Sequence, residues 1–207
     1  MKKLIMGFAL IALVVIITGC PKPCVEANYS FAATSQIVPD IDSIKIGDTL
    51  FLTSSFSTSL IDQRTGRTVD YSDANDIEST LSIAELINND STPEGSVYNF
   101  KYYSEIGLIY NATDIPNPET VQQLKYLQVG NTYQIKIGLI PQKPGIFALG
   151  IGNGLSNQRN HSSKCEKAAF TFTIANTAQH IYYYQNWRPS YHLSASDISK
   201  LYCFKVY

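Results

Sequence analysis

The stretch NTYQIKIGL, residues 131–139, decides the fold class of this chain. Its larger apolar side chains, Tyr133, Ile135, Ile137 and Leu139, alternate with polar or small neighbours. A period of two places successive side chains on opposite faces of an extended strand, so the stretch predicts a strand with one buried face. Such a face has to be covered by another layer, which predicts a layered sheet.

Similar alternation continues on both sides of this stretch. It predicts seven to nine short strands. Two regions, residues 62–69 and 97–110, are interpreted as hairpins, each with a polar turn between two arms. Residues 80–87 fit either a strand or a helix. The remaining strands are expected at residues 28–37, 44–46, 49–53, 133–139, 145–151, 170–174 and 202–206.

Two segments have helical features instead. Val121, Leu124 and Leu127 recur at about helical spacing after Pro118, which suits a first helical turn, so residues 117–128 are expected to be helical. Residues 178–187 are interpreted as a second short helix. The pattern as a whole predicts a mainly β, antiparallel sandwich with one or two short helical insertions.

Two segments resemble parts of immunoglobulin-like modules. Ile46-Gly47-Asp48-Thr49-Leu50 resembles the entry to a strand of such a domain. The Pro-Gly turn at Pro144-Gly145, with the alternating residues that follow, is similar to a penultimate hairpin. The resemblance implies an immunoglobulin-like β-sandwich.

The first twenty residues form a leader. Lys2 and Lys3 precede an apolar run that is too short to span a bilayer comfortably, as in a secretory signal. The run ends in Ile17-Thr18-Gly19-Cys20, which resembles the lipobox of bacterial lipoproteins. The resemblance implies a diacylglyceryl group on the Cys20 thiol, cleavage before Cys20 and acylation of the new amino terminus.

The expected organisation is therefore a signal peptide over residues 1–19, a lipidated tether over 20–27 and a single β-sandwich-like domain over 28–207. The closing run 201–207, the pair Lys164-Cys165 and the strand near Ile46 resemble a group of bacterial lipoproteins. That group supplies no activity to carry over.

Charge argues against one class of partner. The leader holds two of the sixteen Lys and Arg and no acid, which leaves 14 basic against 17 acidic residues in the mature part. A nucleic-acid binder usually shows a basic stripe, so no nucleic-acid partner is expected.

Export would place the mature chain where disulfides persist. With Cys20 lipidated, Cys24, Cys165 and Cys203 remain. We favour a Cys165–Cys203 bridge because both residues lie in the expected folded body, while Cys24 lies in the tether. Pairing of Cys24 with either of them stays open.

No recognised catalytic or phosphate-binding motif is present in the sequence, so no catalytic residue, metal or cofactor is assigned. His161, His180 and His192 follow no ligand spacing. The acidic stretch from Asp70 to Glu78 does not match a calcium loop and is interpreted as a solvated loop.

Aromatic residues give the one candidate surface. Tyr182, Tyr183, Tyr184 and Trp187 form the densest aromatic patch, and such side chains stack on sugars or anchor partner proteins. The alternative is a helix that caps one end of the sandwich.

The sequence thus predicts a lipid-anchored envelope protein with a non-enzymatic binding role. The expected partners are the membrane, through Cys20, and a glycan or envelope protein. The expected location is the outer membrane, facing the periplasm or the cell surface. Two alternatives are an envelope hydrolase with a site assembled from loops and a structural subunit of a surface assembly.

Overall fold

The protein is built mainly from β-strands. The computed structural model describes residues 28–74, 76–87, 94–111, 120–156 and 166–207. The expected signal peptide, Cys20 and the tether lie outside these residues.

Sixteen strands and three short helical elements are described. In chain order they are β1 (Tyr29–Val38), β2 (Ser43–Ile44), β3 (Leu50–Ser57), β4 (Ser59–Ile61), β5 (Thr68–Asp70), β6 (Glu78–Glu85), β7 (Glu94–Gly95), η1 (Val97–Asn99), β8 (Phe100–Ile106), β9 (Leu108–Asn111), β10 (Val121–Lys125), β11 (Leu127–Val129), β12 (Thr132–Pro141), β13 (Gly145–Ile151), β14 (Gly154–Ser156), β15 (Ala168–Ile174), α2 (Tyr182–Trp187), α3 (Ala195–Ile198) and β16 (Leu201–Val206).

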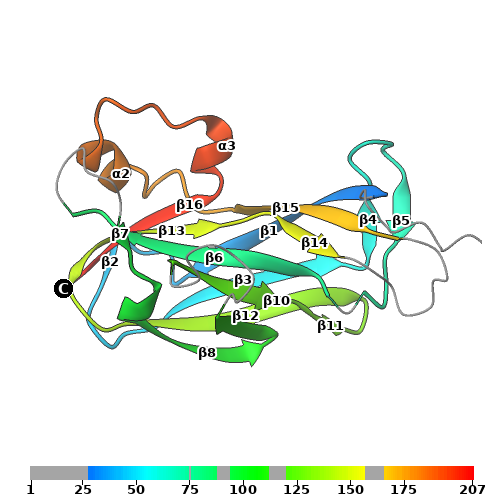
Figure 1. Ribbon diagram of the computed structural model, residues 1–207, viewed down its shortest axis with the longest axis horizontal. Coiled ribbons are helices and arrows are strands. Elements are labelled where there is room, and N and C mark those ends of the chain that lie inside the picture. The colour runs from blue at the N-terminus through cyan, green and yellow to red at the C-terminus, as the bar shows by residue number, and fades with distance from the viewer. Residues whose placement is uncertain (1–27, 75, 88–93, 112–119, 157–165) are drawn as a thin grey trace, which may run out of the picture.

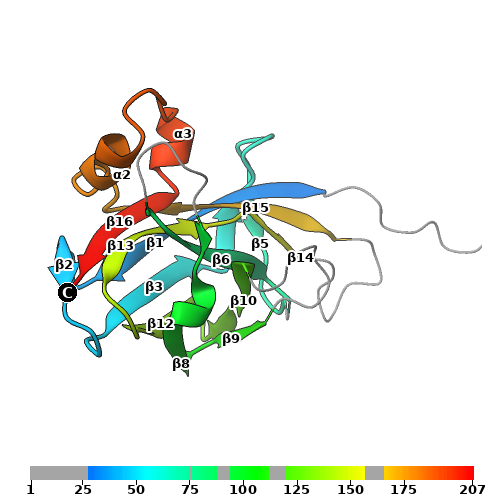
Figure 2. The ribbon, with the colours of Figure 1, turned by 60° about the vertical axis from the view of Figure 1, so that its left-hand side comes forward.

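The strands form two layers that share one core. The β12 layer contains β8 and β11, then β12, β3, β1 and β15, while the β13 layer contains β9, β10, β6, β13, β16 and β2. Strand β14 connects them by pairing with both β15 and β6. Figures 1 and 2 show β8 and β12 on one side of the body and β13 and β16 on the other.

Aromatic rings fill the space between the layers. Phe100 on β8 contacts Phe147 on β13 and Phe204 on β16, with ring centroids 5.1 and 6.1 Å apart. Phe172 on β15 stacks on Tyr126, which lies between β10 and β11, at 4.9 Å and an interplanar angle of 12°. The two layers therefore bury their apolar faces in one continuous cluster.

The period-two prediction is confirmed where alternation was clearest. Tyr133, Ile135, Ile137 and Leu139 on β12 are all buried, as are the alternate residues of β1 and β15. Residues 80–87, which fitted either element, belong to strand β6 and its end. The polar turn at 62–67 connects the arms of the β4–β5 hairpin, as predicted.

The sheet is mixed, so the expected antiparallel arrangement holds for most of the described strand pairs but not for all of them. Strand β1 pairs with β15 in parallel, with Phe31 opposite Phe170, and β2 pairs with β16 in parallel. Parallel pairing requires a long connection, which period-two patterning does not report. Sequence alternation fixes which face is buried, while the direction of the neighbouring strand is left open.

The helix predicted over residues 117–128 is wrong for its described part. Residues 121–125 form strand β10, in which Gln122 and Leu124 are buried alternately. The apolar spacing of three arose because Val121, Leu124 and Leu127 belong to two strands that are separated by the buried Tyr126. The short helix predicted over residues 178–187 is confirmed in part, because α2 occupies residues 182–187.

The predicted hairpin at residues 97–110 contains the expected strands with different partners. Strand β8 pairs with β12 and β9 pairs with β10, so the chain passes from one layer to the other. Gly107 makes the corner with φ +76, and a Cβ there would lie 2.7 Å from the carbonyl oxygen of Lys125. Glycine meets both requirements, because it adopts positive φ readily and has no Cβ.

Replacing Phe172 by Ala tests the shared core. We expect the free energy of unfolding to fall by about 3–5 kcal/mol, because the ring is fully buried and contacts Tyr126 and Phe170. Urea unfolding followed by tyrosine fluorescence measures the change. Thr171→Ala is the control, since Thr171 is exposed on the opposite face of β15 and should cost well under 1 kcal/mol. An equal loss of unfolding free energy in the two variants would contradict the assignment of Phe172 to the shared core.

Candidate binding site

The aromatic patch predicted as a binding surface is largely a second, smaller core. Helix α2 lies over the outer face of β13 and β16 (Figure 1). Its residue Trp187 is only 4% exposed and packs in a cluster with Leu86, Ala148 and Cys203. The prediction that Trp187 lies on a binding surface is therefore wrong, because the residue belongs to a core.

The three tyrosines of the patch are not equivalent. Tyr182 is exposed and stacks on Tyr183 with ring centroids 4.2 Å apart, while Tyr184 makes an edge contact with Trp187. Successive helical residues point in different directions, so a run of three tyrosines does not make one platform. The helix covers an apolar sheet face, whereas the alternative interpretation placed it over one end of the sandwich.

Cys203 lies beneath this helix. Burial raises the pKa of its thiol to about 12, so the group is neutral. Its predicted disulfide partner Cys165 lies outside the described residues, as do Cys20 and Cys24. The Cys165–Cys203 pairing therefore stays a prediction.

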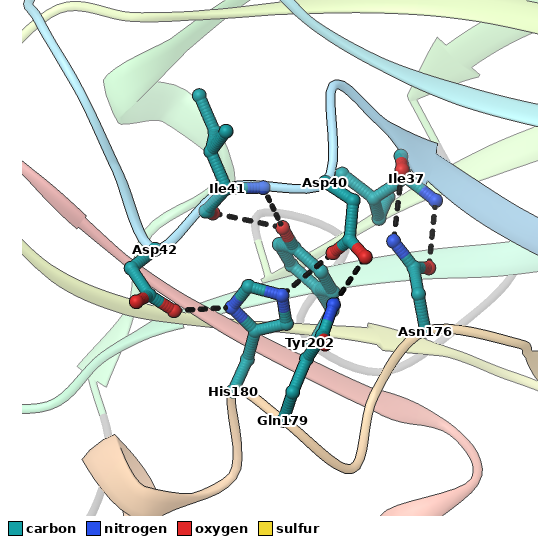
Figure 3. Close-up of polar contacts among 8 residues, drawn as sticks. All are labelled: Ile37, Asp40, Ile41, Asp42, Asn176, Gln179, His180 and Tyr202. Atoms are coloured by element: carbon teal, nitrogen blue, oxygen red, sulfur yellow. Dashed lines mark hydrogen bonds and ion pairs between the residues drawn. The ribbon is translucent and has the colours of Figure 1, made fainter.

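Two aspartates on the β1–β2 connection hold a buried histidine, as Figure 3 shows. The Nε2 atom of His180 lies 2.6 Å from Oδ1 of Asp40, within hydrogen-bond distance. Its Nδ1 atom lies 2.8 Å from Oδ1 of Asp42, as an ion pair when the ring is protonated, although not in hydrogen-bond geometry. We call these three residues the His180 clamp.

Neighbouring side chains fix both segments of the clamp. The Tyr202 hydroxyl donates to the carbonyl of Ile41 at 2.9 Å and accepts from its N–H at 3.1 Å. The Asn176 amide bonds the N–H and carbonyl of Ile37 in the same way, and Gln179 donates to Asp40 (Figure 3). The clamp thereby joins the end of β1 to the segment before α2.

The Asp40 carboxyl is tuned by two opposing effects. Desolvation is the largest single influence on its pKa and raises it. The hydrogen bonds to the carboxylate, of which that with His180 is the strongest, lower the pKa. Their combined effect exceeds that of desolvation, so the pKa lies below its ordinary value of 3.8. The carboxylate is therefore charged at neutral pH.

This geometry suits a structural connection better than catalysis. A general base needs a ring nitrogen that can reach a substrate, whereas both nitrogens of His180 face carboxylates and the side chain is buried. His192 is exposed, and His161 lies outside the described residues. Sequence reasoning missed the clamp because Asp40 and His180 are 140 residues apart.

Three turns and strand β11 form a groove beside β9. Its walls come from residues 73–74, 107–108, 125–128 and 130, and its volume is about 450 Å³. Leu108 and Leu127 line it and are 56% and 53% exposed, while the neighbouring Tyr126 is buried. We call this feature the edge groove.

Gln128 connects two of these turns. Its Oε1 accepts from the N–H of Asp73 at 2.6 Å, and its Nε2 donates to the carbonyl of Gly130 at 3.1 Å. Each of the three turns contains one residue with positive φ, namely Asp73, Gly107 and Gly130. The groove is thus made by backbone turns that a side-chain pattern does not reveal.

The lining of the edge groove is suited to binding. Among the described residues, its only charged side chains are those of Asp73 and Lys125, and it contains no histidine or cysteine. Lys125 lies 3.9 Å from Glu78, outside the lining. A largely apolar groove with a few polar groups is the usual form of a ligand site.

The acidic stretch from Asp70 to Glu78 does not converge on a metal. Asp70 accepts from the N–H of Ser72, Asp76 accepts from Ser156, and Glu78 accepts from Tyr110. Within the described ranges, no group of three or more His, Cys, Asp or Glu residues is arranged to hold a metal ion.

Comparisons with known proteins yield structural similarity alone. No protein-family model and no curated protein sequence matches the chain. The Reelin-N domain of F-spondin is similar over 71% of this chain and 83% of its own, with 12% identity and a TM-score of 0.31. The CupB6 tip adhesin from Pseudomonas aeruginosa is similar over 75% of this chain and 44% of its own, with 13% identity and a TM-score of 0.17.

No helix formed by the described residues has the length and hydropathy needed to cross a bilayer.

Replacing Asp40 by Asn tests the His180 clamp. At neutral pH we expect the free energy of unfolding to fall by about 1 kcal/mol, a modest value because Asp40 is 40% exposed and solvent screens its charge. Its folded pKa lies below the unfolded one, so the stabilisation is complete above about pH 4 and is lost as pH falls through the folded value. The difference in the free energy of unfolding between variant and wild type should therefore become smaller in acid.

Urea unfolding between about pH 7 and pH 2 measures this difference. Glu94→Gln removes an exposed carboxylate on β7 and serves as the control. A loss of stability in Asp40→Asn that stays constant down to pH 2 would argue against a charge-dependent clamp.

Proposed function

We propose that the protein is a lipid-anchored module of the bacterial cell envelope that binds an apolar segment of another envelope protein in the edge groove. The observation that carries the binding role is the groove itself, which two exposed leucines and a buried tyrosine line. Burial of apolar surface contributes about 25 cal/mol of free energy per Å², so a ligand that covers these leucines would be stabilised by their removal from water.

The framework of the groove supports binding by a preformed site. The Gln128 hydrogen bonds join its turns, and Gly107 packs against Lys125 and Ile135. A site that is already ordered loses little conformational entropy when a ligand enters. An extended apolar peptide also fits the neighbouring strand β9, which pairs only with β10 among the described strands.

We also propose that the sandwich is of the immunoglobulin-like kind. Its two layers, its shared core and the turn at Gly47 with φ +86 support this assignment. The parallel pairing of β1 with β15 and the helices over β13 and β16 would be additions to that plan.

The anchor rests on the lipobox resemblance at Cys20. Each buried methylene contributes about 0.8 kcal/mol, and one acyl chain alone binds a membrane only marginally. Two or three chains on Cys20 would hold the protein at the outer membrane, facing the periplasm or the cell surface. The binding domain would then work at the end of the short tether 20–27.

Cys20→Ala tests the anchor in the native host. We expect the variant to lose metabolic labelling by a fatty acid and to leave the membrane fraction on an alkaline wash, because the acceptor thiol is gone. Cys24→Ala is the matched control and should keep both properties. Labelling that persists in Cys20→Ala would refute the lipoprotein assignment.

A photo-reactive residue at position 127 tests the edge groove. In intact envelopes we expect benzoylphenylalanine in place of Leu127 to crosslink to a discrete partner protein. The same residue in place of Ile61 should not, although Ile61 is 57% exposed on the β4–β5 hairpin. Leu108→Asp should abolish the crosslink from position 127. Similar crosslinking from 127 and 61, or none from 127, would contradict a groove ligand.

A further inference from the structure

Within the part of the chain that the structure describes, strand β8 forms an unpaired edge of the β12 layer. Among the described strands it pairs only with β12, and it lies at the outer side of that layer in Figures 1 and 2. Open edges are templates for pairing with another strand, and proteins usually cover or interrupt them. The edge of β8 is therefore a place where a partner strand can add.

The backbone groups that face outward follow from the register. The N–H of Gln142 donates to the carbonyl of Asn99, and hydrogen-bonded pairs alternate along antiparallel strands. Lys101 and Tyr103 therefore bond to β12, while the N–H and carbonyl groups of Tyr102 and Ser104 point away from it. Pro141, which has no N–H, lies opposite Phe100 at a non-bonded position, in agreement with this alternation of bonded and non-bonded pairs.

The side chains of β8 are complementary to a second copy of themselves. The strand reads FKYYSEI, with Tyr103 at its centre. If two such strands run antiparallel with Tyr103 opposite Tyr103, then Lys101 of each copy lies opposite Glu105 of the other. Tyr102 lies opposite Ser104, so the outward backbone groups meet as hydrogen-bonded pairs.

The charges of this edge are available for such contacts. Lys101 is exposed and makes no ion pair within the described residues. Glu105 pairs with Lys136 on its own sheet and is still 40% exposed, so a second cation can approach it. Tyr103 is partly exposed on the same outer face, where its ring meets Phe51 edge-on. Opposite charges placed across from each other stabilise cross-strand pairing.

We propose that β8 of one molecule pairs with β8 of a second copy about a two-fold axis at Tyr103, so that the two β12 layers form one continuous sheet. The contact is isologous, because the same strand serves both partners. The register shift between Lys136 and Ile137 places Glu105 at a bulge and limits regular pairing to the centre of the strand. This dimer is separate from the edge groove and does not depend on its ligand.

A cysteine on the axis tests the register. In the full-length protein in native membranes, we expect Tyr103→Cys to form an intermolecular disulfide under mild oxidation, because residues at a non-bonded antiparallel position lie within bridging distance. Tyr98→Cys is the control, since Tyr98 is more exposed than Tyr103 but lies outside β8. A disulfide dimer for Tyr98→Cys alone, or for neither variant, would overturn the proposal.

Charge reversal tests the complementarity. We expect Lys101→Glu and Glu105→Lys each to weaken self-association of the lipidated protein about tenfold or more, because each puts like charges opposite each other twice per dimer. An equal mixture of the two variants should restore association, since every contact then joins opposite charges. Sedimentation equilibrium in density-matched detergent measures this. Failure of the mixture to recover, or wild-type protein that is monomeric at all concentrations, would overturn the proposal.

Discussion

The aromatic rings between the two strand layers are the constraint on which the rest of the structure depends. Phe31 and Phe170 meet across the β1–β15 pair with centroids 5.4 Å apart, and Phe172 continues the row to Tyr126. Because both strand layers contribute rings to this core, neither layer has a core without the other. The interior is thereby occupied, and the features available for function lie in turns, at edges and on outer faces.

Two further attachments lie outside the shared core. Helix α2 covers the outer face of β13 and β16 with Trp187, and the His180 clamp joins the preceding segment to the end of β1. The clamp is placed next to the buried Tyr202, whose ring lies 4.4 Å from that of His180. Among the described strands, β8 and β9 each pair with a single neighbour, and the edge groove lies beside β9.

The sequence predicts the strands well and their partners poorly. Alternation identifies β1, β12, β15 and β16 because burial of one face is a local property of each strand. Pairing direction, and the passage of the chain from β8 to β9 at Gly107, depend on segments far apart in the sequence. The apolar spacing before residue 128 imitated a helix because a strand boundary fell within it.

The candidate sites were harder to predict for the same reason. The edge groove depends on Asp73, Gly107 and Gln128, which come from two turns and strand β11, and no motif connects them. The His180 clamp joins residues 140 positions apart. The aromatic run at 182–187 was visible in the sequence, but composition alone does not distinguish a ring that faces solvent from one that packs under a helix.

Mass spectrometry of the amino terminus, on protein isolated from its native host, tests the central claim most directly. The account predicts that the mature chain begins at Cys20 and carries the added mass of two or three acyl chains on that residue. A chain that begins with an intact, unmodified Met1 would contradict it, because the domain would then have no lipid anchor and no reason to be placed in the envelope.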